Sequence, residues 1–238
     1  MAAGLSLVAG GGAPLRRRPV LLAPVPPEPG VGRRLPAAPG PTLSEWFAAS
    51  PRDAGWAGLL LAQLPRGKPL LWIQERMAIL EGGRIHPPGL GPVELIHVAA
   101  GDARAALWAM EEGLRCVSLG AVIGELWGDP AALDFTATRR LAVAAERHGV
   151  PAFLVRLGGG ANLSGARMRW RVASAPSLPH PLNPKAPGIP AWEAELFRAR
   201  GAAPGRWRVA HEPGSANPVD LVAAAGDRTL GQERRRSA

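Results

Sequence analysis

The segment from Ala48 to Gly55 and the residues after it stand where an α/β protein that binds nucleotides would carry its phosphate-binding loop. Such a loop needs glycines for close backbone approach, a lysine for the β- and γ-phosphates and a hydroxyl for magnesium. On the template G-x-x-x-x-G-K-[ST], Ser50 and Gly55 fall at the glycines, Trp56 at the lysine and Ala57 at the hydroxyl. Because a tryptophan brings no charge and fills the space of a phosphate, we expect a degenerate loop without ATP hydrolysis.

The acid that could organise magnesium beside such a loop is Glu125. It closes an apolar run that begins at Ala121, and strands of this kind often end at a magnesium-organising acid. Without a phosphate loop, the simpler interpretation is a carboxylate that faces solvent at the end of a strand. The predicted nucleotide site is therefore degenerate and non-functional, and its residues are Ser50, Gly55, Trp56, Ala57 and Glu125.

No other group of residues indicates catalysis or metal binding. The five histidines have no zinc-ligand spacing, and the single cysteine, Cys116, cannot form an intrachain disulfide or a typical structural zinc site. Cys116 lies between a predicted helix and a predicted strand, where we expect a small buried side chain. The sequence therefore predicts no catalytic residue, no metal and no cofactor.

Arginine and tryptophan alternate at two places, 169–171 and 206–208, each with the order Arg-Trp-Arg. On a strand the two arginines share one face and the tryptophan points to the other. We expect both tryptophans to pack in the core, so that the arginines can contact phosphates; exposed tryptophans would instead suit base stacking. The tentative contacts for DNA or a partner are Arg139, Arg140, Arg167, Arg169 and Arg171. For the pair on a predicted helix, Arg139 and Arg140, a solvated surface is the simpler interpretation.

The central stretch 101–156 predicts the elements that would position these residues. Asp102 and then Leu133–Thr136 open two helices, and Gly149 and Pro151 stop the second. Apolar strands at 121–126 and 152–155 follow the helices. Strands that alternate with helices predict a parallel sheet covered on both faces.

The flanking stretches extend this α/β pattern. Upstream, we expect strands at 43–47, 69–74 and 94–98, a helix at 57–64, and irregular structure over 74–91. The units 43–47, 57–64 and 69–74 form a predicted βαβ unit. Downstream, 158–160 reads as a flexible joint, and strands follow at 167–172, 206–211 and 220–223. The segment 192–200 fits a strand or a helical turn, so we expect antiparallel strands at the end of the sheet.

Charge and composition divide the 238 residues into three parts. Residues 1–41 hold nine Pro and seven Gly with a charge of +4, which predicts a disordered arm with at most a short strand at 20–22. Residues 42–230 form the predicted domain, and 231–238 a basic tail. The net charge of +9 gathers on the flanks, because 42–155 carries −2 and 156–238 carries +7. Basic flanks favour a polyanion such as nucleic acid, although a solvated arginine surface explains them equally well. No apolar run suits a membrane helix or a signal peptide, so we expect a cytoplasmic protein.

Several of these segments resemble one family. Residues 106–115, ALWAMEEGLR, are similar to the ALWALEEALR segment of ImuA proteins, and 133–141, LDFTATRRL, to their LDLTASRRL. Residues 169–172, 70–74 and 192–208 resemble the family's RWRV strand, its LLWVQ strand and its tryptophan-ended hairpin. The resemblance covers about 42–225, and the double arginine is its most specific part.

The resemblance implies a RecA-like, P-loop-NTPase-type fold and a role in the bacterial SOS response to DNA damage. It implies an accessory of error-prone translesion synthesis that works with ImuB and, through ImuB, with a DnaE-type polymerase. RecA and DNA are further candidate partners, and the protein would be nucleoid-associated when active. Since the phosphate loop is nearly erased, we expect a non-catalytic adaptor. A weak RecA-like ATPase and a SulA-like inhibitor of cell division remain the alternatives.

Overall fold

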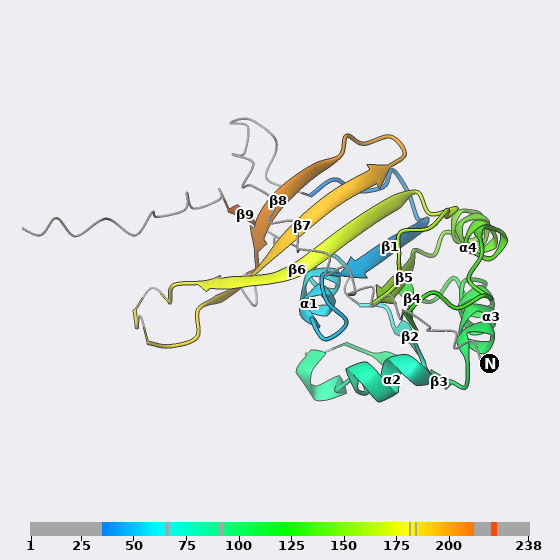
Figure 1. The fold of residues 1–238 in the computed structure, drawn as a ribbon, viewed down its shortest axis with the longest axis horizontal. Helices are drawn as coiled ribbons and strands as arrows, with labels where there is room; N and C mark the ends of the chain where they lie inside the picture. Colours follow the sequence, from blue (N-terminus) through cyan, green and yellow to red (C-terminus); the bar gives the residue numbers. More distant parts are fainter. Residues whose placement is uncertain are drawn as a thin grey trace, which may run out of the picture.

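A mostly parallel β-sheet with helices on both faces organises the chain (Figure 1). The computed structural model describes residues 35–64, 67–90, 93–180, 182–183, 185–211 and 220–222. Most of the predicted arm, with its short strand at 20–22, and the whole predicted tail at 231–238 lie outside these residues.

The nine described strands are β1 Leu43–Ala48, β2 Leu70–Glu75, β3 Leu95–Ala100, β4 Ala121–Trp127, β5 Ala152–Leu157, β6 Met168–Leu178, β7 Ile189–Ala199, β8 Gly205–Ala210 and β9 Asp220–Val222. The helices in the described part are α1 Gly55–Leu61, α2 Arg76–Gly82, α3 Ala103–Gly113 and α4 Phe135–His148, with a 3₁₀ turn at Pro87–Leu90.

The strands lie in the order β3-β2-β4-β5-β1-β6-β7-β8-β9. Neighbours from β3 to β6 are parallel, and those from β6 to β9 are antiparallel. The predicted α/β class, with a parallel core and antiparallel C-terminal strands, is confirmed. The predicted βαβ unit is confirmed in its order of elements, but β4 and β5 separate its two strands.

Local signals begin and end the two long helices as expected. The carboxylate of Asp102 accepts the backbone N–H of Ala105 at 2.8 Å, and that of Asp134 accepts the N–H of Ala137 at 2.7 Å. Gly149 follows α4 in the left-handed conformation, with φ of 71°, which glycine adopts at no steric cost. These local signals mark where both helices start and where α4 stops.

Each face of the sheet packs its own hydrophobic core. Helices α3 and α4 cover one face through side chains such as Met110 and Leu141, both essentially inaccessible to solvent. Helices α1 and α2 cover the other face, where tryptophans dominate, among them Trp56, Trp72 and Trp170. The parallel strands other than the edge strand β3 are therefore buried on both sides, as continuous apolar runs predict.

Three local predictions were wrong. Residues 76–82 form helix α2 rather than irregular structure, because a seven-residue helix that buries only Ala78 leaves almost no periodic signal. Cys116 is exposed in the turn after α3 rather than buried. The glycine joint after β5 is tied down, because the N–H of Gly160 donates to the carboxylate of Asp129 at 2.9 Å. Of the segment 192–200, all residues but Arg200 lie within strand β7, which excludes a helical turn.

Among the described residues, no helix is both long enough and apolar enough to cross a membrane.

A glycine holds the loop after β5 against α4. An added Cβ at Gly165 would lie 2.6 Å from the Cα of Arg139, and the N–H of Gly165 donates to the Thr138 hydroxyl at 2.9 Å. Because the obstacle is backbone, we expect Gly165→Ala to lower the free energy of unfolding by about 1–3 kcal/mol. Urea denaturation measures this. Gly101→Ala is the matched control, since an added Cβ meets nothing within 4 Å there, and equal effects would contradict the prediction.

Candidate functional site

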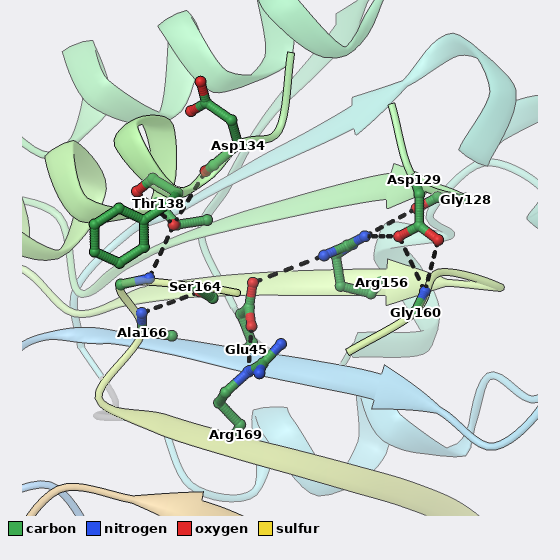
Figure 2. A network of polar contacts seen from close by, with 12 residues as sticks. Glu45, Gly128, Asp129, Asp134, Thr138, Arg156, Gly160, Ser164, Ala166 and Arg169 are labelled. Atoms are coloured by element: carbon green, nitrogen blue, oxygen red, sulfur yellow. Dashed lines mark hydrogen bonds and ion pairs between the residues drawn. The ribbon is translucent and has the colours of Figure 1, made fainter. Parts of the chain in front are cut away.

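Three loops meet at the carboxyl edge of the parallel strands, where open α/β sheets bind their ligands. They follow β1, β4 and β5, which are neighbours in the sheet in the order β4-β5-β1. Figure 2 shows the polar contacts that join the loops after β4 and β5 to β1 and β6. The predicted phosphate-loop residues follow β1 at this edge, so it is the first place to test for a binding site.

The loop after β1 is fixed by Asp53, which sequence reasoning missed. Its carboxylate accepts the N–H of Gly55 at 2.9 Å, and on β6 it accepts both the N–H and the hydroxyl of Ser174, at 2.9 and 2.6 Å. Burial opposes ionisation here, but the hydrogen bonds from Ser174 and Gly55 hold the pKa of Asp53 below its ordinary value. The loop is therefore anchored to the sheet by a side chain rather than organised around a ligand.

The residues at the phosphate-loop positions lie against protein. An added Cβ at Gly55 would lie 2.2 Å from the Ser174 hydroxyl, so the loop is pressed onto β6. Trp56, at the lysine position of the template, is 4% exposed, and its ring centroid lies 5.9 Å from that of Trp72. Ala57 is half-buried against the same core, and Ser50 is exposed in the turn.

Glu125 is buried on the α1 and α2 side of the sheet, so the expectation of a solvent-facing carboxylate was wrong. Its carboxylate accepts the indole N–H of Trp72 and, at 3.1 Å, the side-chain amide of Gln74. Burial raises the pKa of Glu125, although both hydrogen bonds act in the opposite direction. Trp72 therefore links the two predicted remnants, since it packs on Trp56 and holds Glu125.

Gln74 extends this buried contact toward the edge of the sheet. Its amide N–H₂ also donates to the carbonyl of Gly83 at 3.1 Å, and its oxygen accepts the N–H of Ile85 at 3.0 Å. The Nε2 atom of His97 lies 3.1 Å from the same oxygen. Burial and the nearby charge of Arg84 lower the pKa of His97, which favours a neutral ring that donates to Gln74.

A second buried cluster joins β1, β5 and β6. Glu45 is 0% exposed, and its carboxylate lies 2.6 Å from Nε of Arg169 and 3.8 Å from a guanidinium nitrogen of Arg156. Arg156 also donates to the carbonyl of Gly128 at 3.1 Å and to the carboxylate of Asp129 (Figure 2). This guanidinium therefore ties the loop after β4 to the centre of the sheet.

Aromatic rings complete the surroundings of the buried arginines. The guanidinium of Arg169 lies 5.3 Å from the ring centroids of both Phe47 and Phe197. Burial lowers the pKa of Arg156, while Glu45 and Asp129 raise it. An arginine keeps its charge even so, and the cluster consequently balances two buried guanidiniums against carboxylates and ring faces.

The five predicted contacts for DNA or a partner fall into two groups. Arg139 and Arg140 are exposed on α4, and the other three lie along β6 or just before it. Arg169 is buried, so it does not present its guanidinium at the surface as a DNA contact requires. Arg167 pairs with Glu146 at 2.6 Å and Arg171 with Glu195 at 3.2 Å. DNA contact by the four remaining arginines stays a prediction.

The tryptophans of the two Arg-Trp-Arg segments point away from the arginines. Trp170 is 3% exposed, which confirms its predicted place in the core. Trp207 is half-buried against the same core, and its ring centroid lies 5.9 Å from that of Trp170. An exposed stacking surface at Trp170 is therefore excluded.

Near the carboxyl edge, Gly55, Trp56 and Glu125 each make contacts within the protein. In the part of the chain that the structure describes, no three His, Cys, Asp or Glu side chains group as metal ligands. Asp53 and the partners of Arg156 and Arg169 escaped the sequence analysis because those partners lie far away in the chain. An acid two residues before a helix was the one local signal for Asp53.

We expect Glu45→Gln to lower the free energy of unfolding by roughly 3–5 kcal/mol, because it leaves two buried guanidiniums without their shared carboxylate. Urea denaturation measures the loss. The control is Glu146→Gln, whose pair with Arg167 is partly exposed and should contribute at most about 1 kcal/mol. Equal losses in the two variants would show that the buried cluster contributes no more to the free energy of unfolding than a partly exposed ion pair does.

Glu125 predicts a pH dependence. Because burial raises its pKa in the folded chain, the folded state holds its proton more tightly than the unfolded state. The wild type should therefore lose stability relative to Glu125→Gln as the pH rises from the unfolded carboxyl pKa through the folded one. Urea denaturation of both proteins from acidic to neutral pH measures the difference. A difference that is constant with pH would contradict the assignment.

Comparison with known proteins identifies the family. No family model matches the chain. Over 176 residues the chain is 34% identical to Protein ImuA of Caulobacter vibrioides, and the same values hold for two strains of that bacterium. The match covers 68% of this chain and 69% of the relative. An identity of this size over two thirds of both proteins confirms the resemblance that the sequence motifs indicated: the chain belongs to the ImuA family.

Proposed function

We propose that this protein is a non-catalytic adaptor in damage-induced mutagenesis, with a RecA-like core whose nucleotide site has been lost. One observation carries the proposal. The indole of Trp56 is buried at the lysine position of a phosphate loop and packs on Trp72, whose N–H bonds to Glu125. Protein contacts thus occupy both the position for phosphate and the acid for magnesium.

The surroundings of the loop support the same proposal. Asp53 and Ser174 close the loop onto β6, and Arg156 and Asp129 close the neighbouring loops. A nucleotide entering here would have to break several hydrogen bonds and a buried ion pair. The free-energy cost of breaking these contacts opposes nucleotide binding. A preformed ligand site instead keeps its hydrogen-bond donors free for the ligand.

The family supports the biological context. The relatives carry the name Protein ImuA, and the resemblance implies error-prone translesion synthesis in the SOS response. On this proposal the protein binds ImuB and reaches a DnaE-type polymerase through it, with RecA and DNA as further candidate partners. Its contribution is to present surfaces, while the polymerase supplies the chemistry.

Two measurements on the purified full chain test the proposal. Calorimetry with ATP and magnesium should show no binding, and co-purification with ImuB should recover a complex. ATP turnover that disappears in Glu125→Ala would instead support the weak ATPase, because that variant removes the one acid suited to magnesium. Cell filamentation on overexpression would support the SulA-like alternative.

The matched control for turnover is Glu94→Ala, which removes a carboxylate before β3, outside the proposed remnant. Loss of turnover in both variants would indicate a contaminating ATPase or a folding defect rather than a site at Glu125. Failure to recover ImuB with a folded chain would overturn the adaptor role.

A further inference from the structure

Helices α3 and α4 lie side by side on one face of the sheet (Figure 1). Residues of α4, of the end of α3 and of the turn after it line a groove of about 500 Å³. Neither the degenerate nucleotide site nor the buried ion pairs use this groove. Its lining includes Glu111, Arg115, Arg139, Arg140, Val143 and Arg147.

The groove has an excess of positive charge. Arg140 is paired with Glu111 at 2.6 Å, and Arg115 with Glu112 at 3.3 Å. Arg139 and Arg147 make no ion pair with any residue that the structure describes. They are eight residues apart on α4, so they lie about 12 Å apart along the helix, or roughly two turns.

The centre of the groove is apolar. Val143 lies halfway between the two arginines, four residues from each, and it is 48% exposed. Trp108 on α3 does not line the groove itself, but it is 65% exposed and precedes the lining residue Glu111 by three residues, which places the two on one face of α3. Exposed tryptophan beside an apolar floor is typical of surfaces that anchor a protein partner.

We propose that this groove binds an acidic amphipathic helix of a partner protein. Acids two turns apart on such a helix would face Arg139 and Arg147, and an apolar side chain between them would cover Val143. Helix-in-groove recognition uses apolar anchors at helical spacing in this way, and the opposite charges select the partner and its register. The inference rests on the proposed adaptor role and adds where the contact lies and which chemistry it uses.

The same features argue against nucleic acid as the occupant. The carboxylate of Glu111 already pairs with Arg140, so this guanidinium is less available to a phosphate, while an acidic helix can place a neutral or apolar position there. The apolar floor at Val143 gives nothing to a phosphate backbone, whose affinity comes from cations along its whole track. An amphipathic helix uses both the floor and the flanking charges.

A peptide selection on the immobilised full chain tests the proposal without ImuB. The probe is a displayed library of random 16-residue peptides, followed by fluorescence anisotropy of the enriched sequences. We expect enrichment of peptides with acids two turns apart around an apolar residue. The double variant Arg139→Glu/Arg147→Glu should bind these peptides about tenfold or more weakly than the wild type, because each new carboxylate faces an acid of the peptide.

The control is Arg76→Glu/Arg84→Glu, which makes the same change of charge at exposed positions on and after α2, on the other side of the sheet. It should leave binding within about twofold of the wild type. A matched peptide with lysines in place of the acids should bind the Arg139→Glu/Arg147→Glu variant better than the wild type. Circular dichroism and urea denaturation check that both variants are folded.

Three outcomes overturn the proposal. Enrichment of no peptide, or of peptides without acids, excludes an acidic helix as the occupant. Equal weakening by the α2 control would indicate general attraction to a basic protein. Binding of a 20-residue thymidine oligonucleotide that only the groove variant abolishes would assign the groove to nucleic acid. Peptide binding without recovery of ImuB would retain the groove and reject ImuB as the partner.

Discussion

The buried carboxylate of Glu45 is the interaction on which the middle of this sheet depends. It lies on β1, whose two neighbours in the sheet are β5 and β6. The carboxylate faces a guanidinium from each of them, Arg156 on β5 and Arg169 on β6. A guanidinium is expensive to take out of water, so each arginine is held in place by the cost of losing its partner. Phe47 and Phe197 also offer ring faces to Arg169, and this contact reduces the cost of taking its guanidinium out of water.

This cluster has a consequence for the carboxyl edge of the sheet. Arg156 reaches outward to Gly128 and Asp129, and Asp129 in turn holds Gly160. The loops after β4 and β5 are therefore tied to the core, in the crevice where an α/β sheet of this kind would admit a ligand. The polar groups of these loops are engaged within the protein, and this arrangement accords with the adaptor that we propose.

The loop after β1 follows the same physical logic. Trp56 adds its indole to a core rich in tryptophan, and Asp53 accepts the backbone N–H groups of Gly55 and Ser174. Surfaces away from this edge keep their exposed groups, among them Val143 in the α3 and α4 groove and Trp108 on the neighbouring surface of α3. The molecule thus separates a closed carboxyl edge from an open helical face, and the groove on that face is where we propose a partner binds.

Much of the fold was predictable because its signals are local. Caps at Asp102 and Asp134, the stop at Gly149 and the alternation around Trp170 each act within a few residues, so the order of strands and helices and the α/β class follow from the sequence. The sequence alone also shows that Trp56 and Ala57 stand where the phosphate-loop template has a lysine and a hydroxyl residue. Helix α2 was missed because only one of its residues is buried.

The tertiary structure alone decided which charges are buried and what they hold. Arg169 looked like a surface contact, yet its partner Glu45 lies 124 residues away, and the Asp53 to Ser174 contact spans 121 residues. Residue spacing along one strand fixes which side chains share a face, but not whether that face is covered or paired. Whether an arginine meets water or a buried carboxylate depends on which strands become neighbours, and that choice is made only when the whole sheet assembles.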